Sequence, residues 1–182
     1  MQQLFRGKLF NLQIALKKLN SQLYIGMEKI PAEVNYFFQN QGFVIVSTID
    51  SQGQIHCSAK GIARIEEEGK VYLIDLYQAN TFRNLQNNPT ITITAVDERR
   101  FKGYALKGKA RIVEKKDLGE PILKEWDEKV VKRISDRLIK NIQEDKKASN
   151  HPEARFPEAK YLIVMSVEQI IDLSPAHLKE KT

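Results

Sequence analysis

Small polar side chains and one arginine gather at residues 80–84, where the sequence predicts a short helix that ends before Pro89. The start of a helix exposes about four N–H groups without partners in the helix, together with a partial positive charge. A phosphate can bind to such a helix start, and a threonine hydroxyl can donate to a phosphate oxygen. The candidate anion-binding residues of this stretch are Asn80, Thr81, Arg83 and Asn84.

A second candidate group, Ser58-Ala59-Lys60, lies in the strand that we expect at residues 55–65. Lys60 would supply a point charge for an anion. A plainer interpretation also stands at this stage. Asn80 or Thr81 would then only cap the helix, and Asn84 would lie on the helix surface.

Other arrangements that carry chemistry are weaker. Cys57 follows His56 in the predicted strand, and adjacent strand residues point to opposite faces, so these two do not form a Cys–His nucleophile. We predict that Cys57 is a small buried residue and that Trp126 belongs to the core. His151 and His177 lack the spacing typical of a metal site. We therefore predict no metal and name no catalytic residue.

Composition restricts the classes of partner. The 182 residues carry a formal net charge of +6, which suits an anionic ligand. The basic residues are not interleaved with aromatic residues as a base-stacking platform would be, so we expect no nucleic acid. With one cysteine no internal disulfide can form, which fits a reducing compartment, and we predict a cytoplasmic protein.

Residues 1–26 differ from the rest because they are basic and no acid precedes Glu28. Phenylalanine and leucine recur at alternating spacings of four and three, which predicts an amphipathic helix. A docking helix or an upstream extension is the plain interpretation; contact with a membrane surface or another chain, or an organelle presequence, is the alternative. We divide the chain into this extension and a domain at residues 27–182.

Apolar and polar residues alternate in much of that domain. From Thr90 to Ala95 every second residue is apolar, which predicts a strand with one buried face. Gly103 and Gly108 indicate bends or bulges in the next strand. The chain predicts helices at 30–42, 80–88 and 117–143 and strands at 43–49, 55–65, 71–76, 90–95, 101–113 and 160–167. Six strands with long helices near the ends predict an α+β fold, an antiparallel β-barrel with flanking helices.

The order of these elements resembles the pyridoxamine 5′-phosphate oxidase-like family of FMN-binding split barrels, over about residues 30–175. Four segments carry the resemblance: "VSTIDSQGQIHCSAKG", "NTFRNLQNNPTITI", "FKGYALKGKARIVE" and "YLIVMSVEQIIDLSP". The third contains the glycines Gly103 and Gly108 followed by Ala110. The resemblance implies a six-stranded antiparallel split barrel that forms an obligate homodimer, with FMN bound between the protomers.

The same resemblance implies where FMN binds. Its phosphate would meet Ser58, Ala59 and Lys60 on the second strand, and Asn80, Thr81 and Asn84 at the start of the short helix. Many family members have lysine or arginine where this chain has Asn80 and Thr81, so the phosphate charge would depend on Lys60, with Arg83 or a residue of the partner. Phe101 and Lys102 would cover the isoalloxazine ring of the partner's flavin.

Vitamin B6 oxidation is not expected. The B6 oxidase carries an Arg-x-His-x-Arg pattern near its C-terminus, whereas residues 160–182 of this chain contain no arginine. We predict an FMN-binding oxidoreductase or electron carrier. The alternative is a binding module without turnover, on the same barrel, for haem, a deazaflavin or another anionic ligand.

Overall fold

The computed structural model describes residues 27–114, 117, 120–143, 157, 159 and 161–179. The predictions for residues 1–26 lie outside the described residues. Within the described part, helices and strands follow one another in the predicted order.

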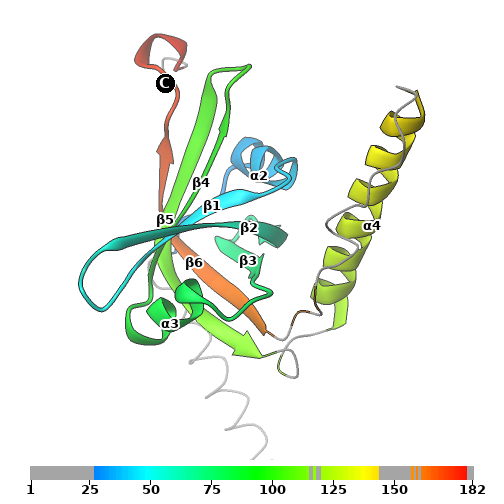
Figure 1. Ribbon diagram of the computed structural model, residues 1–182. Coiled ribbons are helices and arrows are strands. Elements are labelled where there is room, and N and C mark those ends of the chain that lie inside the picture. Colours follow the sequence, from blue (N-terminus) through cyan, green and yellow to red (C-terminus); the bar gives the residue numbers. More distant parts are fainter. Residues whose placement is uncertain are drawn as a thin grey trace, which may run out of the picture.

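Six antiparallel strands form a closed barrel in the order β1-β2-β3-β6-β5-β4 (Figure 1). This confirms the predicted split-barrel fold. Closure gives every strand two neighbours, so the barrel has no open edge. The strands are β1 (Val44–Ile49), β2 (Ile55–Glu66), β3 (Lys70–Ile74), β4 (Thr90–Asp97), β5 (Lys102–Glu114) and β6 (Tyr161–Asp172).

The alternating pattern of β4 produces the buried face that the sequence predicts. Ile91, Ile93 and Ala95 are buried, and the threonines between them are half-buried. β5 alternates in the same way, because Lys107 and Lys109 are exposed while their neighbours are buried. β6 is longer than predicted and continues to Asp172, since β5 pairs with it along its whole length.

Gly108 shows why a glycine is needed in β5. The register between β5 and β6 shifts between Lys107 and Gly108, as in a β-bulge. A Cβ atom at Gly108 would lie 2.0 Å from the carbonyl oxygen of Ser166. Only glycine allows the two backbones to approach this closely, and the predicted bulge is confirmed at this position.

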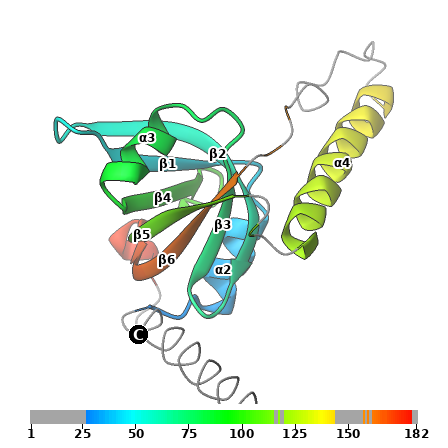
Figure 2. The ribbon, with the colours of Figure 1, turned by 90° about the horizontal axis from the view of Figure 1, so that it is seen from below.

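Helices close the two ends of the barrel. α2 (Ala32–Gln39) inserts Phe37 and Phe38 into the main core, and the ring of Phe37 packs edge-on against Tyr104 at 5.2 Å. α3 (Asn80–Asn87) lies at the opposite end from α2 (Figure 2). It contributes Leu85 to the same core.

α4 (Glu120–Gln143) lies against the outside of β2. Trp126 is buried, as predicted, and fills the space next to Gly61, where an added Cβ would lie 2.4 Å from the indole ring. Arg64 forms a two-point hydrogen bond with Glu125. Val131 on the same helix is 62% exposed, so only some of the apolar side chains of α4 pack against the barrel.

None of the helices in the described part of the chain is long and apolar enough to cross a membrane. A short 3₁₀ helix, η3 (Ala176–Leu178), follows β6.

Candidate functional site

The start of α3 presents a pair of hydroxyl groups, from buried Thr81 and half-buried Ser58. Thr81 is 2% exposed, and its Oγ1 lies 2.9 Å from Ser58 Oγ on β2. The residue that caps the helix is Ala79, and no side chain caps the helix start. The capping interpretation of Asn80 and Thr81 is therefore wrong. Thr81 faces the barrel because β2 lies directly against the first turn of α3.

Asn84 is also turned inward, and its expected surface position in the capping interpretation is wrong as well. The residue is buried, and its Nδ2 donates a hydrogen bond of 3.0 Å to Thr48 Oγ1 on β1. Thr48 itself is 1% exposed. Two of the three residues that α3 buries, Thr81 and Asn84, are thus polar, which is unusual for the face that a helix packs on a core.

Lys60 lies on the same side of β2 as Ser58. Their strand partners Val44 and Val46 are both buried in the core. The Lys60 ammonium forms an ion pair of 2.9 Å with Asp75, and the two side chains are 9% and 2% exposed. The expected point charge at this site is therefore present, but a buried carboxylate neutralises it.

Asp75 was not predicted as a site residue from the sequence. The signal available was an acid placed directly after the apolar strand "VYLI", where a buried position requires a partner. Nothing in the spacing connects it to Lys60, which is on another strand. The pairing arises because Gly61 and Ile74 are register partners, which brings the residues beside them together.

Tyr161, at the start of β6, completes this buried cluster. Within the described residues, neither its hydroxyl nor Asp75 Oδ2 has a hydrogen-bond partner. Burial raises the pKa of Tyr161 well above its ordinary value, and the Asp75 carboxylate raises it further. The ring of Phe82 on α3 packs edge-on against Tyr161 at 4.8 Å. Tyr161 is therefore a neutral phenol beneath α3 that can donate a hydrogen bond.

A cavity of about 350 Å³ opens between α3 and the β1–β2 hairpin. Its lining contains three of the predicted residues, with Arg83 bonded to the Asn80 side-chain oxygen. Most of the lining is polar, which suits a charged or hydrogen-bonding ligand rather than an apolar one. The lining residues are Asp50, Ser51, His56, Asn80, Arg83, Asn84 and Asn87.

Ala59 and Cys57 point away from these groups, to the outer face of β2. Both are exposed, so the prediction that Cys57 is buried is wrong. Its Sγ lies 3.4 Å from Ser47 Oγ on the neighbouring strand. Cys57 faces outward because its neighbour Ser58 points inward, and successive side chains of a strand point to opposite faces.

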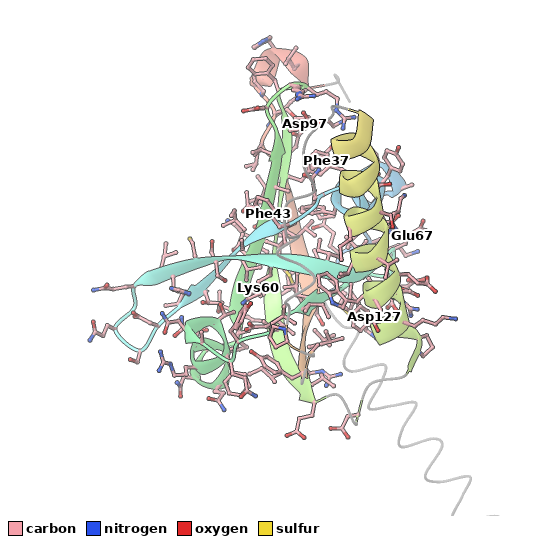
Figure 3. The ribbon with its side chains drawn as sticks, turned by 45° about the vertical axis from the view of Figure 1, so that its right-hand side comes forward. Phe37, Phe43, Lys60, Glu67, Asp97 and Asp127 are labelled. Carbon is pink, nitrogen blue, oxygen red and sulfur yellow. The ribbon has the colours of Figure 1, made fainter. Side chains whose placement is uncertain are left out.

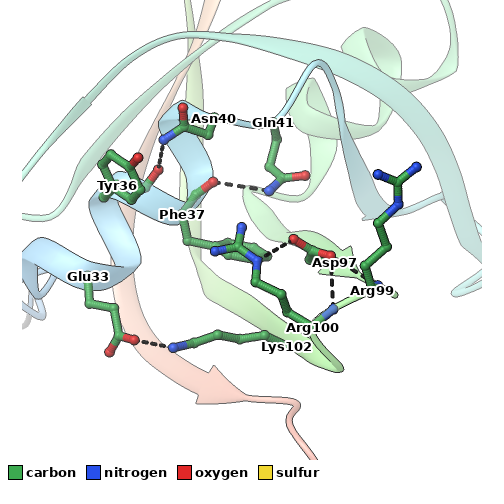
Figure 4. A network of polar contacts seen from close by, with 9 residues as sticks. All are labelled: Glu33, Tyr36, Phe37, Asn40, Gln41, Asp97, Arg99, Arg100 and Lys102. Atoms are coloured by element: carbon green, nitrogen blue, oxygen red, sulfur yellow. Dashed lines mark hydrogen bonds and ion pairs between the residues drawn. The ribbon is translucent and has the colours of Figure 1, made fainter.

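Phe101 and Lys102 lie at the other end of the molecule. They belong to the turn and start of β5, beyond the full length of β4, which spans roughly 25 Å at about 3.3 Å per residue. Figure 3 shows Asp97 at this tip, away from Lys60. Phe101 is exposed with a φ of 50°. Lys102 pairs with Glu33 of α2, and Asp97 with Arg100 (Figure 4). Within one protomer these two residues are not brought to the α3 end.

The groups at the α3 end fit a phosphate. The start of α3 lacks a side-chain cap, and the Ser58 and Thr81 hydroxyls lie beside it. Arg83 supplies a positive charge in the first turn. Lys60 contributes less than a free ammonium would, because Asp75 holds it. A phosphate at this position would therefore be bound mainly by N–H groups and hydroxyls.

Comparisons with known proteins agree with this architecture. A family model described as pyridoxamine 5′-phosphate oxidase matches residues 30–169, whereas no curated protein matches the chain. HupZ of Group A Streptococcus has 21% identity and a TM-score of 0.54, covering 80% of this chain and 94% of that chain. An FMN-binding protein from Syntrophomonas wolfei subsp. wolfei has 13% identity and a TM-score of 0.52, covering 92% of this chain and 98% of that chain. Both likenesses show the fold alone.

Proposed function

Since the chain belongs to the pyridoxamine 5′-phosphate oxidase family, we propose that it binds FMN and serves as a flavin-dependent oxidoreductase or electron carrier. The observation that carries this proposal is the hydroxyl pair of half-buried Ser58 and buried Thr81 at the uncapped start of α3. Two hydroxyls beside N–H groups that no side chain caps form a seat for the phosphate of FMN.

Roles follow for the remaining predicted residues. Arg83 would pair with the phosphate from the solvent side, and Asn84 would hold the first turn of α3 against Thr48 on β1. Lys60 would lie next to the hydroxyl pair with its charge shared with Asp75. FMN itself supplies the redox chemistry when bound. The protein residues bind and orient it, and none of them is proposed as an acid or base.

We propose further that two copies of the chain form a homodimer with the flavin between them. The outer face of β1, β2 and β4 supports this, because three large apolar side chains are exposed on it. By strand register Ile45, Ile55 and Val96 lie on this face, with exposed fractions of 40–75%. Phe101 and Lys102 of one protomer would reach the flavin held by its partner.

Ile45→Asp tests the dimer, because a carboxylate at the centre of a covered apolar face is costly. We expect monomers in light scattering and loss of bound flavin. Val131→Asp, at an exposed apolar position on α4, is the matched control and should remain dimeric. A dimer that survives Ile45→Asp would place the interface elsewhere.

FMN binding is tested by the visible spectrum of the purified chain, followed by mass analysis of any chromophore released on denaturation. Thr81→Val removes the hydroxyl without changing the volume much and should weaken FMN binding about tenfold or more. The control is Thr90→Val in β4, which removes a hydroxyl that accepts a hydrogen bond from Lys109. This variant should bind FMN normally. A chain that is colourless and does not take up added FMN would overturn the proposal.

The neutralised Lys60 favours one second candidate, a binding module without turnover for haem, a deazaflavin or another anionic ligand. A ligand with less charge near α3 than a phosphate would not need a free ammonium there. A Soret band, or a tightly bound deazaflavin without reductase activity, would favour this candidate over FMN.

A further inference from the structure

The ion pair between Lys60 and Asp75 is buried but incompletely satisfied. Desolvating two charges is costly unless further hydrogen bonds complete both groups. Asp75 Oδ1 accepts from Lys60 and, at 3.4 Å, from the backbone N–H of Tyr77. Asp75 Oδ2 has no hydrogen-bond partner within the described residues, and the nearby Tyr161 hydroxyl has none either.

Its location connects the pair to the proposed phosphate seat. Lys60 and Ser58 lie two residues apart on the inward side of β2, which separates them by about 7 Å along the strand. Ser58 in turn contacts Thr81 at the start of α3. A phosphate on the hydroxyl pair would therefore lie near both charges of the ion pair, in a region that is shielded from solvent.

We propose that Asp75 is a specificity-determining residue that sets how much negative charge the site accepts. This inference depends on the proposed FMN site and deepens it. The Asp75 carboxylate repels a phosphate dianion and also holds the Lys60 ammonium that would attract it. The two opposite charges nearly cancel at the seat, so binding depends on neutral donors and on Arg83. The chain then prefers a flavin with a phosphate over one without by less than it would with a free Lys60 ammonium.

The affinities of FMN and riboflavin separate this effect from a general disturbance of the site. The two ligands share the isoalloxazine ring and differ in the phosphate, so a purely structural change weakens both alike. The full chain, freed of bound flavin, is titrated with each ligand at one fixed ionic strength, because salt screens charge interactions. The measured quantity is the ratio of the riboflavin Kd to the FMN Kd.

Three variants form a cycle around the pair. Asp75→Asn leaves the Lys60 charge uncompensated and should raise the ratio about tenfold, as expected for one unit charge in a partly buried site. Lys60→Met leaves the carboxylate alone and should lower the ratio by a similar factor. The double variant has neither charge, and its ratio should return to within about threefold of the unsubstituted chain. Glu128→Gln removes an equal charge from exposed α4 and should leave the ratio unchanged.

Each single variant leaves one buried group unpaired, so thermal unfolding is measured for all of them. The double variant restores a neutral interior and keeps the test informative if a single variant fails to fold. FMN binding with the same ratio in every folded variant would overturn this inference and leave the FMN proposal intact. Binding of FMN only after Asp75→Asn would support the inference and overturn FMN as the ligand of the unsubstituted chain. Binding of neither flavin by any variant would overturn both.

Discussion

Two helices close the two ends of the barrel with different chemistry. Three of the four residues that α2 buries are apolar, and its ion pair with Lys102 lies at the surface. Only one of the three residues that α3 buries is apolar. Beneath α3 lie a hydroxyl pair, an amide bonded to a hydroxyl and an ion pair, all of them largely removed from solvent.

The two ends therefore differ in how their contacts contribute to stability. Apolar contacts such as those of Phe37 and Phe38 stabilise a fold without requiring a hydrogen-bond partner of fixed geometry. Buried polar groups cost free energy unless each is satisfied. Several buried polar groups lie at the α3 end, and two of their atoms have no hydrogen-bond partner within the described residues, which supports the ligand site proposed there.

The largest expected effect tests the apolar end. Phe38 is fully buried, so Phe38→Ala should lower the free energy of unfolding by about 3–5 kcal/mol through lost burial and a residual cavity. Urea unfolding measures this. Tyr36→Ala, at an exposed position on the same helix, should change it by less than about 0.5 kcal/mol. A loss below about 1 kcal/mol for Phe38→Ala would show that α2 does not fill this end.

The next effect tests the polar end. Asn84→Ala leaves the buried Thr48 hydroxyl without its donor and should cost about 1–3 kcal/mol of unfolding free energy. Replacing both groups, as Asn84→Leu with Thr48→Val, should recover most of that stability because no polar group is left unpaired. We expect the double variant to bind FMN more weakly all the same. Unchanged FMN affinity in the folded double variant would show that the Asn84–Thr48 hydrogen bond contributes to stability alone, as the apolar contacts of α2 do.

A smaller effect concerns α4, which packs outside the barrel and should respond to acid independently of both ends. A hydrogen bond from Arg64 lowers the pKa of Glu125 below its ordinary value. A lowered pKa means that the carboxylate stabilises the folded state above its unfolded-state pKa of about 4.3, and that this contribution is lost as the pH falls through the lower folded-state pKa. Trp126, the single tryptophan, reports on α4 through its fluorescence.

In an acid titration the emission of Trp126 should shift to longer wavelength before far-ultraviolet circular dichroism reports loss of the strands. Glu125→Gln should show the shifted emission already at neutral pH, whereas Glu128→Gln, one turn along the same helix, should not. Simultaneous loss of both signals in every variant would mean that α4 and the barrel unfold as one unit.

The smallest effect returns to the α2 end. The Lys102–Glu33 pair is solvent-exposed, so Lys102→Met should change the free energy of unfolding by less than about 0.5 kcal/mol. Measured FMN affinity makes this variant informative. A loss of about tenfold with stability unchanged would show that Lys102 reaches the partner's flavin. Both ends would then contribute to one site in the dimer.

Local pattern was enough to predict the strands, because alternation sets which face is buried. Thr90 to Ala95 and the lysines of β5 show this directly. It was harder to predict which face of β2 points inward, since small or polar residues occupy both of its faces. Cys57 was therefore placed on the wrong face. For α3, Thr81 and Asn84 have the types that cap helices, and only the position of β1 and β2 turns them inward.

The Lys60–Asp75 pair could not be predicted from local pattern at all. It depends on the register between β2 and β3, which the sequence does not state residue by residue. The candidate site was thus predicted as a set of residues near one helix, while its balance of charge required the three-dimensional arrangement.

The closed strand order has a consequence for how the chain is made. β6 pairs with β3 on one side and β5 on the other, yet it is synthesised after the other five strands of the barrel. During translation the barrel stays open, with the edges of β3 and β5 unpaired, until residues 161–172 have left the ribosome. Because Ile74 must pair with Leu162, which is about half of the chain away in sequence, we expect closure to be a slow step. The nascent chain is exposed to edge-to-edge aggregation until that step, so chaperones that cover strand edges would act on this protein before its last strand is complete.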